Sequence, residues 1–230
     1  AIDSNIAHTA AIEFLDEIAK VLGDVIKIGV GGPPAELRRF DDISEDLGDL
    51  VEEFDRRGVR YVRVYRDHID IPLAKAFGTD DLKVAEERAR AKGMDVDFAS
   101  DGSMRSAHTV RGAVGDAAQG KKLHFNQAHM FHASRLRPQD REGMVQLFGE
   151  DGLPRQALWG DGEQIPDETI DRVVEVLRKH TQVIEWTDDD VVLIDNLRFL
   201  HGRQTFDGER KVTVAMGANQ DLSERTALSL

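Results

Sequence analysis

Cysteine is absent from the 230-residue sequence. This excludes a disulfide scaffold, a thiol nucleophile, an iron–sulfur cluster and a cysteine-ligated zinc site, so a metal centre would have to use His, Asp and Glu. Long apolar runs are also lacking, because stretches such as Val191–Ile194 are far shorter than the ~20 residues of a membrane-spanning helix. No signal or transit segment is visible either. We therefore expect a cytoplasmic protein with no membrane partner.

Positive charge is scarce. The 30 Lys and Arg residues face 43 Asp and Glu residues, which gives a formal net charge of −13. Because nucleic-acid binding is driven by clustered Lys and Arg, we expect no nucleic-acid partner, although one basic pocket for a small acid remains compatible with this balance. The sequence contains no repeat or low-complexity tract. Since β-rich domains of ~200–250 residues are common, we expect a single domain over residues 1–230.

The spacing of apolar residues predicts short strands separated by Asp-Asn and Asp-Gly turns, with helices between them. This pattern is typical of a barrel or jelly-roll sheet with helices packed outside, a mainly β member of the α+β class. The turn residues Asp195 and Asn196 are expected to have a structural role. Strands are predicted at 25–30, 59–65, 122–126, 191–194, 197–201 and 210–216, and helices at 12–22, 37–57, 80–92, 137–147 and from Asp167 onward.

Most of the chemical information lies in residues 191–217. A buried strand leads through a tight turn to a second strand that ends in His201, and Arg210 begins another strand. A histidine at a strand end can present an imidazole to a barrel mouth, and an arginine on the adjacent strand suits a carboxylate. That combination is what a 2-oxo-acid-dependent iron enzyme needs. Taken alone, His201 could instead bond a turn carbonyl, and Arg210 could be a solvated strand residue.

The pattern Asp-Asn-x4-His-Gly-Arg-x2-Phe-x-Gly-x-Arg runs from Asp195 to Arg210, and Arg57–Arg63, Phe125–Gln127 and Gly160–Gly162 add to it upstream. These motifs resemble the taurine dioxygenase-like superfamily of iron(II)/2-oxoglutarate oxygenases, in particular its subgroup from syringomycin-type pathways. The resemblance covers about residues 55–217. It implies a double-stranded β-helix (a jelly roll of the clavaminate synthase type), with His201 as an iron ligand and Arg210 as the partner of the distal 2-oxoglutarate carboxylate.

A complete iron site of this kind uses two histidines and one carboxylate. The sequence has one His-x-Asp match, His68 and Asp70, which we take as candidate ligands. The resemblance would instead place the metal motif near residues 3–9, where Asp3 and Asn5 occupy the ligand positions. The family's threonine near 2-oxoglutarate is also missing from Gly31–Pro34. Three explanations are open: loss of iron binding, an unusual ligand set, or a sequence that omits a segment with the missing ligands. We favour the last.

A second group of polar residues lies in the middle of the sequence. His124, His129 and His132 have a spacing that superficially resembles a metal cluster, but we interpret them as polar residues that line a cavity or its rim. Asn126 and Gln127 are candidate cavity-lining amides that touch substrate or cosubstrate. Trp159 and Trp186 are expected to be packing residues.

The sequence thus predicts an iron(II)- and 2-oxoglutarate-dependent oxygenase. Its expected reaction is hydroxylation of a small molecule in natural-product biosynthesis, either an amino acid or an aminoacyl group tethered to a carrier protein. One alternative is a catalytically silent β-helix module that binds a small acid or a partner without iron. Another is a halogenase, if the carboxylate ligand is truly absent and chloride takes its position.

Overall fold

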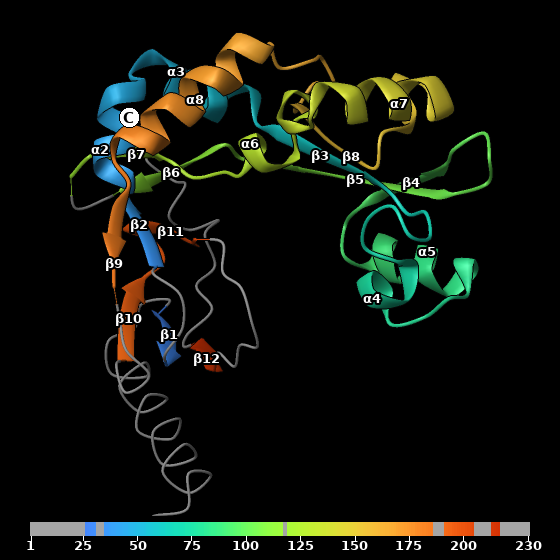
Figure 1. Cartoon of the computed structure of the whole chain (residues 1–230), viewed down its shortest axis with the longest axis horizontal. Coiled ribbons are helices and arrows are strands. Elements are labelled where there is room, and N and C mark those ends of the chain that lie inside the picture. The colour runs from blue at the N-terminus through green and yellow to red at the C-terminus, as the bar shows by residue number, and fades with distance from the viewer. Residues whose placement is uncertain (1–25, 31–34, 117–118, 186–190, 205–212, 217–230) are drawn as a thin grey trace, which may run out of the picture. The chain divides into compact units, whose positions relative to one another are not determined.

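The computed structural model describes residues 26–30, 35–116, 119–185, 191–204 and 213–216 (Figure 1). It combines helices with several antiparallel sheets, which confirms the α+β class. The jelly-roll arrangement stays a prediction. Among the described residues, no helix combines the length and the apolar composition needed to cross a bilayer. The elements are β1 (Ile26–Val30), β2 (Ala35–Arg39), α2 (Phe40–Leu47), α3 (Asp49–Arg57), β3 (Val59–Val64), α4 (Leu73–Phe77), α5 (Leu82–Ala91), β4 (Asp95–Phe98), β5 (Met104–Val110), β6 (Ala113–Asp116), β7 (Lys121–His124), α6 (Ala128–Phe131), η1 (Ala133–Arg135), α7 (Pro138–Phe148), η2 (Glu150–Gly152), β8 (Arg155–Trp159), α8 (Asp167–Lys179), β9 (Gln182–Ile184), β10 (Val191–Asp195), β11 (Phe199–Arg203) and β12 (Thr213–Met216).

The chain divides into two compact units, each assembled from segments distant in sequence. Unit 1 takes its residues from 1–46, 115–123 and 176–230, and unit 2 from 47–114 and 124–175. Each unit therefore depends on contacts between segments that are far apart along the chain. The expectation of one domain over residues 1–230 stays a prediction.

Unit 1 contains two three-stranded antiparallel sheets. The first has the strand order β10-β1-β12, and the second has the order β11-β2-β9. In the second sheet, His201 of β11 lies opposite Leu37 of β2, which in turn lies opposite Gln182 of β9. The predicted strand at 197–201 is thus confirmed as an element but begins two residues later, at Phe199.

The predicted helix over residues 37–57 is wrong in its first part. Residues 35–39 form strand β2, and the helical stretch that follows is interrupted at Gly48, which has a φ of 56°. Local spacing favoured a helix, but β2 pairs on both sides with strands more than 140 residues away in the sequence. Such tertiary pairing overrides a weak local preference. The predicted stop at Gly58 is confirmed.

Unit 2 is built on one four-stranded antiparallel sheet with the order β4-β5-β3-β8. Helices α4 and α5 pack on it through a cluster that includes Phe77, Val96 and Met104. Trp159, 1% exposed, packs against the ring of Phe54 at 4.9 Å, which confirms its prediction as a packing residue. Trp186 lies outside the described residues.

The helices predicted from sequence signals are mostly present at their expected places. In α5, the Asp81 side chain accepts hydrogen bonds from the backbone N–H groups of Lys83 and Val84, as an N-cap should. Helix α7 has Pro138 in its first turn. Helix α8 begins at Asp167 as predicted, and its buried face consists of Ile170, Val173, Val176 and Leu177. The predicted helix at 12–22 and the Gly31–Pro34 segment lie outside the described residues.

Candidate functional site

The turn between β10 and β11 leads directly into the strand that carries His201. The backbone N–H of Leu197 donates to Oδ1 of Asp195 at 2.8 Å, and the backbone N–H of Arg198 donates to the Asp195 carbonyl at 3.1 Å. Such Asx geometry mimics a backbone turn, which is why aspartate is common at this position. The neighbouring Asn196 is half-buried.

Strand register places His201 on a defined face of its sheet. Since side chains alternate along strands, His201 and its partner Leu37 share one face, whereas Glu36 and Arg38 point to the other. Arg38 donates through Nε to the Leu177 carbonyl at 3.0 Å and to Thr181 Oγ1 at 2.8 Å, so the end of α8 covers that other face. The imidazole of His201, which is half-buried, therefore projects from the face that α8 does not cover.

The other residues predicted to bind iron or cosubstrate lie either outside the described residues or in the other unit. Arg210, and the N-terminal positions Asp3 and Asn5, lie outside the described residues. His68 and Asp70 belong to unit 2, whereas His201 belongs to unit 1. The predicted cosubstrate contact of Arg210 and the predicted iron contacts of His201, His68 and Asp70 therefore stay predictions.

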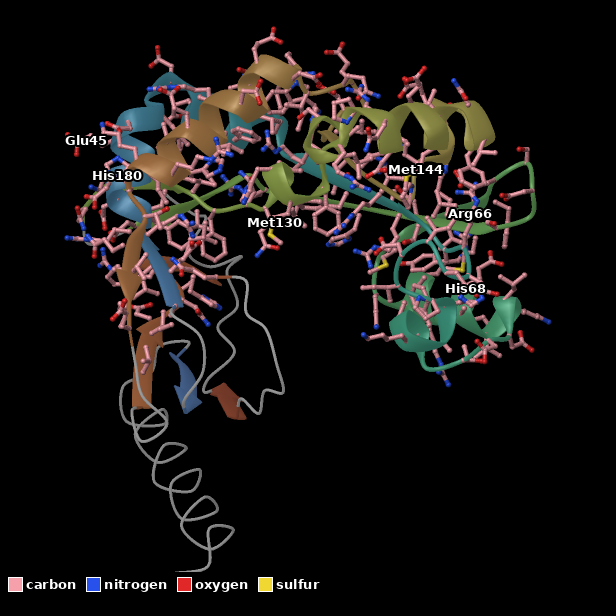
Figure 2. The ribbon with its side chains drawn as sticks, in the orientation of Figure 1. Glu45, Arg66, His68, Met130, Met144 and His180 are labelled. Atoms are coloured by element: carbon pink, nitrogen blue, oxygen red, sulfur yellow. The ribbon has the colours of Figure 1, made fainter. Side chains whose placement is uncertain are left out.

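His68 (Figure 2) lies in the segment that follows β3, and Asp70 comes two residues later in the same segment. His68 is exposed and has a φ of 65°, a left-handed conformation that is uncommon for a residue other than glycine. Oδ2 of Asp70 is buried and lies 3.9 Å from Nε of Arg63. The nearest cation to the Asp70 carboxylate recorded in this part of the chain is therefore an arginine of the sheet.

The described residues do not fit a complete iron site. Within the part of the chain that the structure describes, no three His, Asp or Glu side chains come together in a group able to hold a metal ion. His201 offers one imidazole, and the two-histidine, one-carboxylate set of a non-haem iron oxygenase needs two further ligands. We therefore derive no chemical step through iron from this geometry.

Asn126 and His124 form a partly buried polar contact in unit 2. The Asn126 side-chain amide donates to the Gly112 carbonyl at 2.8 Å, and its Oδ1 accepts from the Ala128 N–H at 3.0 Å. Its Nδ2 also lies 3.3 Å from Nδ1 of His124. Burial, together with the charge of His129, lowers the pKa of His124 to about 3, so this imidazole is neutral at physiological pH.

Gln127 differs from its neighbour in exposure. Its side chain is exposed, and its backbone N–H donates to the Tyr61 hydroxyl at 2.8 Å. The side-chain amide of Asn126 thus forms hydrogen bonds within the protein, whereas the side-chain amide of Gln127 is directed to the surface. The predicted contacts of both side chains with substrate stay predictions.

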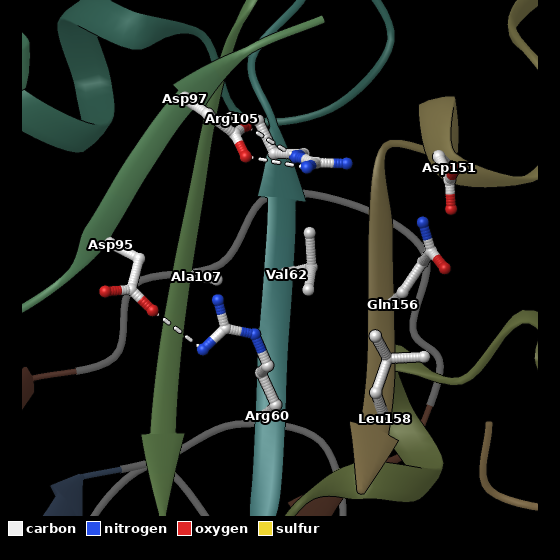
Figure 3. Close-up of a pocket in the computed structure, with 9 residues that line it drawn as sticks. All are labelled: Arg60, Val62, Asp95, Asp97, Arg105, Ala107, Asp151, Gln156 and Leu158. Atoms are coloured by element: carbon white, nitrogen blue, oxygen red, sulfur yellow. Dashed lines mark hydrogen bonds and ion pairs between the residues drawn. The ribbon is translucent and has the colours of Figure 1, made fainter. Parts of the chain in front are cut away.

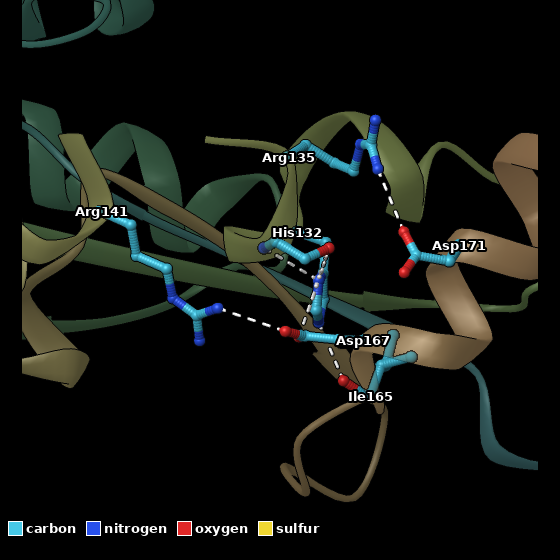
Figure 4. A network of polar contacts seen from close by, with 7 residues as sticks. His132, Arg135, Arg141, Ile165, Asp167 and Asp171 are labelled. Atoms are coloured by element: carbon cyan, nitrogen blue, oxygen red, sulfur yellow. Dashed lines mark hydrogen bonds and ion pairs between the residues drawn. The ribbon is translucent and has the colours of Figure 1, made fainter. Parts of the chain in front are cut away.

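His132 has a structural environment that sequence spacing did not reveal (Figure 4). Its Nδ1 accepts from the Ser134 N–H at 3.2 Å, so its Nε2 carries the proton and donates to the Ile165 carbonyl at 2.9 Å. Burial lowers the pKa of His132 against the opposing effect of that carbonyl and of Asp167. The side chain therefore fastens the segment before α8 as a neutral hydrogen-bonding group.

The sheet of unit 2 carries a pocket of about 240 Å³ that sequence reasoning missed (Figure 3). Arg60 Nη1 lies 2.8 Å from Asp95 Oδ2, and Arg105 binds Asp97 through two contacts of 2.6 Å. The hydrogen bonds from Arg105 lower the pKa of Asp97. The sequence offered one signal for this pocket, the charged residues that occur in β3, β4 and β5. Only the strand register, however, brings these residues onto one face of the sheet.

The sequence is similar to one protein family and to two curated proteins. The model of the taurine catabolism dioxygenase TauD, TfdA family matches residues 40–216. The chain is 34% identical over 168 residues to the dapdiamide synthesis protein DdaC of Enterobacter agglomerans, which covers 73% of this chain and 51% of that protein. It is 28% identical over 188 residues to a clavaminate synthase-like protein of Arabidopsis thaliana, covering 77% and 52%. The chain thus spans about half the length of the curated relatives it matches.

Proposed function

Because the chain belongs to the taurine catabolism dioxygenase TauD, TfdA family, we propose that it is an iron(II)- and 2-oxoglutarate-dependent oxygenase that hydroxylates a small molecule. The observation that carries the proposal is the family match over residues 40–216, which includes the whole Asp195–Arg210 motif. The likeness to a dapdiamide synthesis protein supports a role in natural-product biosynthesis. The proposed substrate is an amino acid, free or tethered to a carrier protein.

Three features of the proposal concern the site. His201 is proposed as one iron ligand, and Arg210 as the residue that binds the distal carboxylate of 2-oxoglutarate through its two-pronged guanidinium. The double-stranded β-helix is the proposed arrangement of the sheets. When bound, iron with 2-oxoglutarate would supply the oxidising power, and the protein would position the substrate and exclude water.

His201 is suited to such a role by its place in the fold. Its strand is paired with β2, and the preceding turn is closed by the Asp195 side chain. Both constraints fix the backbone that carries the imidazole, which helps a metal ligand to be held in a productive geometry.

An anaerobic titration of the full-length protein with iron(II) and 2-oxoglutarate tests this proposal. We expect a visible metal-to-ligand charge-transfer band that needs both additions and disappears in His201→Ala. His180→Gln is the matched control, because His180 pairs with Asp46 at 2.7 Å elsewhere in unit 1 and should leave the band unchanged. His68→Ala and Asp70→Asn test the two remaining candidate ligands in the same assay.

A catalytically silent binding module is the second candidate. It is favoured by one observation, the lack of a three-ligand group among the residues that the structure covers. No band in a correctly folded full-length protein would support this candidate and overturn the oxygenase proposal.

A further inference from the structure

Two arginines face each other across neighbouring strands of the unit 2 sheet. Arg63 of β3 lies directly opposite Arg155 of β8, so both side chains project from the same face. Both residues are half-buried. Like charges directly opposite each other in an antiparallel pair destabilise a sheet, because neighbouring strands are only ~5 Å apart. A negative charge near Arg63 and Arg155 would therefore stabilise the sheet.

The surroundings hold both guanidinium groups near one aromatic ring. The guanidinium carbons of Arg63 and Arg155 lie 5.4 and 5.9 Å from the centre of the Phe131 ring. The same ring packs edge-on against Tyr61 at 5.0 Å, and α6, which carries Phe131, lies along β3 and β8 in Figure 1. Both cations thus lie beside the same aromatic ring, where solvent screens their repulsion less than in open water.

Packing also limits this region on its other side. Tyr65, two residues beyond Arg63 on the same face, packs against Phe77 of α4 at 5.1 Å. Its hydroxyl lies 3.0 Å from Ser106 Oγ, and Ser106 is the β5 residue directly opposite Arg63. The two arginines therefore lie between two packed aromatic pairs.

The described residues do not neutralise this pair of charges. Nε of Arg63 lies 3.9 Å from Oδ2 of Asp70, which is beyond hydrogen-bond length, and no other ion pair of Arg63 or Arg155 is formed within the described ranges. Oδ2 of Asp70 is buried and accepts no hydrogen bond from those ranges. Arg63 thus has one carboxylate at the limit of ion-pair distance, and Arg155 forms no ion pair within the described ranges.

The opposite face of the same sheet provides an internal contrast. There Arg60 and Arg105 each bind their own aspartate at 2.8 and 2.6 Å (Figure 3). The sheet therefore pairs its arginines closely on one face and leaves donors available on the other. Guanidinium donors held near one another match the oxygens of a carboxylate or a phosphoryl group.

We propose that Arg63 and Arg155 form a binding site for the oxyanion group, carboxylate or phosphoryl, of a small molecule, on the face of the sheet that carries Phe131. The bound anion would accept hydrogen bonds from both guanidinium groups and remove their mutual repulsion. The proposal does not depend on iron or on 2-oxoglutarate, so its failure and the failure of the proposed function are distinguishable.

Calorimetric titration of the full-length protein with inorganic phosphate and, separately, with acetate tests the site at constant ionic strength without iron. We expect saturable binding of at least one anion, and the stronger of the two identifies the group. Arg155→Gln and Arg63→Gln should each weaken it about tenfold or more, as expected for the loss of a charge-assisted hydrogen bond. Arg56→Gln, which alters an exposed arginine of α3, is the matched control and should bind like the wild type.

Thermal unfolding separates a binding role from a structural one. In chloride alone, Arg155→Gln should unfold at the same temperature as the wild type or a higher one, because the repulsion is relieved, and the anion should no longer raise that temperature. Arg155→Lys keeps the positive charge but lacks the two-pronged guanidinium. This variant should fold normally and should bind the anion more weakly than the wild type does. No saturable binding by the wild type, wild-type affinity in both glutamine variants, or a loss of stability in Arg155→Gln that is equal with and without anion would overturn the proposal.

Discussion

Nη1 of Arg198 lies 2.8 Å from Oδ2 of Asp116, and this ion pair ties the end of β6 to the turn that leads into β11. The carbonyl of Arg198 also accepts a hydrogen bond from the Phe40 N–H at 2.9 Å, at the start of α2. Arg198 thus connects three segments of unit 1 that are distant in sequence. The strand that carries His201 begins one residue later.

Replacing Arg198 with methionine should lower the free energy of unfolding by about 1–3 kcal/mol, because it leaves the buried Asp116 carboxylate without this partner. Urea unfolding of Arg198→Met measures the change. Arg178→Met, on the exposed surface of α8, is the control and should stay within about 0.5 kcal/mol of the wild type. Equal stability of both variants would show that the ion pair contributes nothing to the turn.

The buried imidazole of His124 should make the protein less stable in mild acid. Burial lowers its pKa to about 3, whereas an unfolded histidine has a pKa near 6.5. Below pH 6.5 this histidine is protonated in the unfolded chain but stays neutral in the folded chain. The corresponding stability is therefore fully present above pH 6.5 and falls as the pH drops toward 3. This group should account for roughly 2 kcal/mol between pH 7 and pH 5.

Urea unfolding of His124→Gln at several pH values isolates that contribution. The glutamine variant should lose less stability than the wild type between pH 7 and pH 5. Parallel pH profiles for wild type and His124→Gln would contradict the expectation.

Tyr61 should ionise well above the usual range. Burial raises the pKa of Tyr61 to about 12, although the hydrogen bond from the Gln127 N–H opposes this shift. Between pH 10 and pH 12 the unfolded chain loses a proton that the folded chain keeps, so the protein becomes less stable as the pH rises through this range.

Spectrophotometric titration of tyrosinate is suited to this test because the sequence contains two tyrosines. Tyr61→Phe should remove the high-pH step and cost about 1 kcal/mol at neutral pH through the lost hydrogen bond. A wild-type titration completed near pH 10 would refute the predicted burial effect.

Gly160 should tolerate no side chain. A Cβ at this position would collide with the backbone carbonyl oxygen of Arg57, which also accepts a hydrogen bond from the Gly160 N–H at 3.1 Å. Gly160→Ala should therefore destabilise the protein by about 1–3 kcal/mol or more. Gly143→Ala is the matched substitution in the interior of α7, where a Cβ meets nothing within 4 Å.

The two alanine variants should move stability in opposite directions. Gly143→Ala should raise the free energy of unfolding by about 0.5–1 kcal/mol, because alanine favours the helix. Thermal or urea unfolding of both variants measures the pair. A stable Gly160→Ala variant would mean that the segment can shift away from Arg57 at little cost.

Elements with strong local signals were predicted well. The helix at α5 has its Asp81 cap, α7 has Pro138 in its first turn, and β3 forms within the strand predicted at 59–65. Strand β2 was missed because its pairing partners lie far away in the sequence. The spacing of His124, His129 and His132 resembled a cluster, but the bonds of His132 to Ile165 and Ser134 depend on packing that no spacing rule describes.

The sequence by itself determined the family, through the Asp195–Arg210 motif, and it excluded any cysteine-based site. It also determined the helices whose caps and apolar spacing are local, since those signals act within a few residues. Tertiary structure alone decided that Arg63 faces Arg155 and that His201 projects from the face opposite Arg38. Strand register is set by pairing between distant segments, and a slip of one residue would turn each of these side chains to the other face.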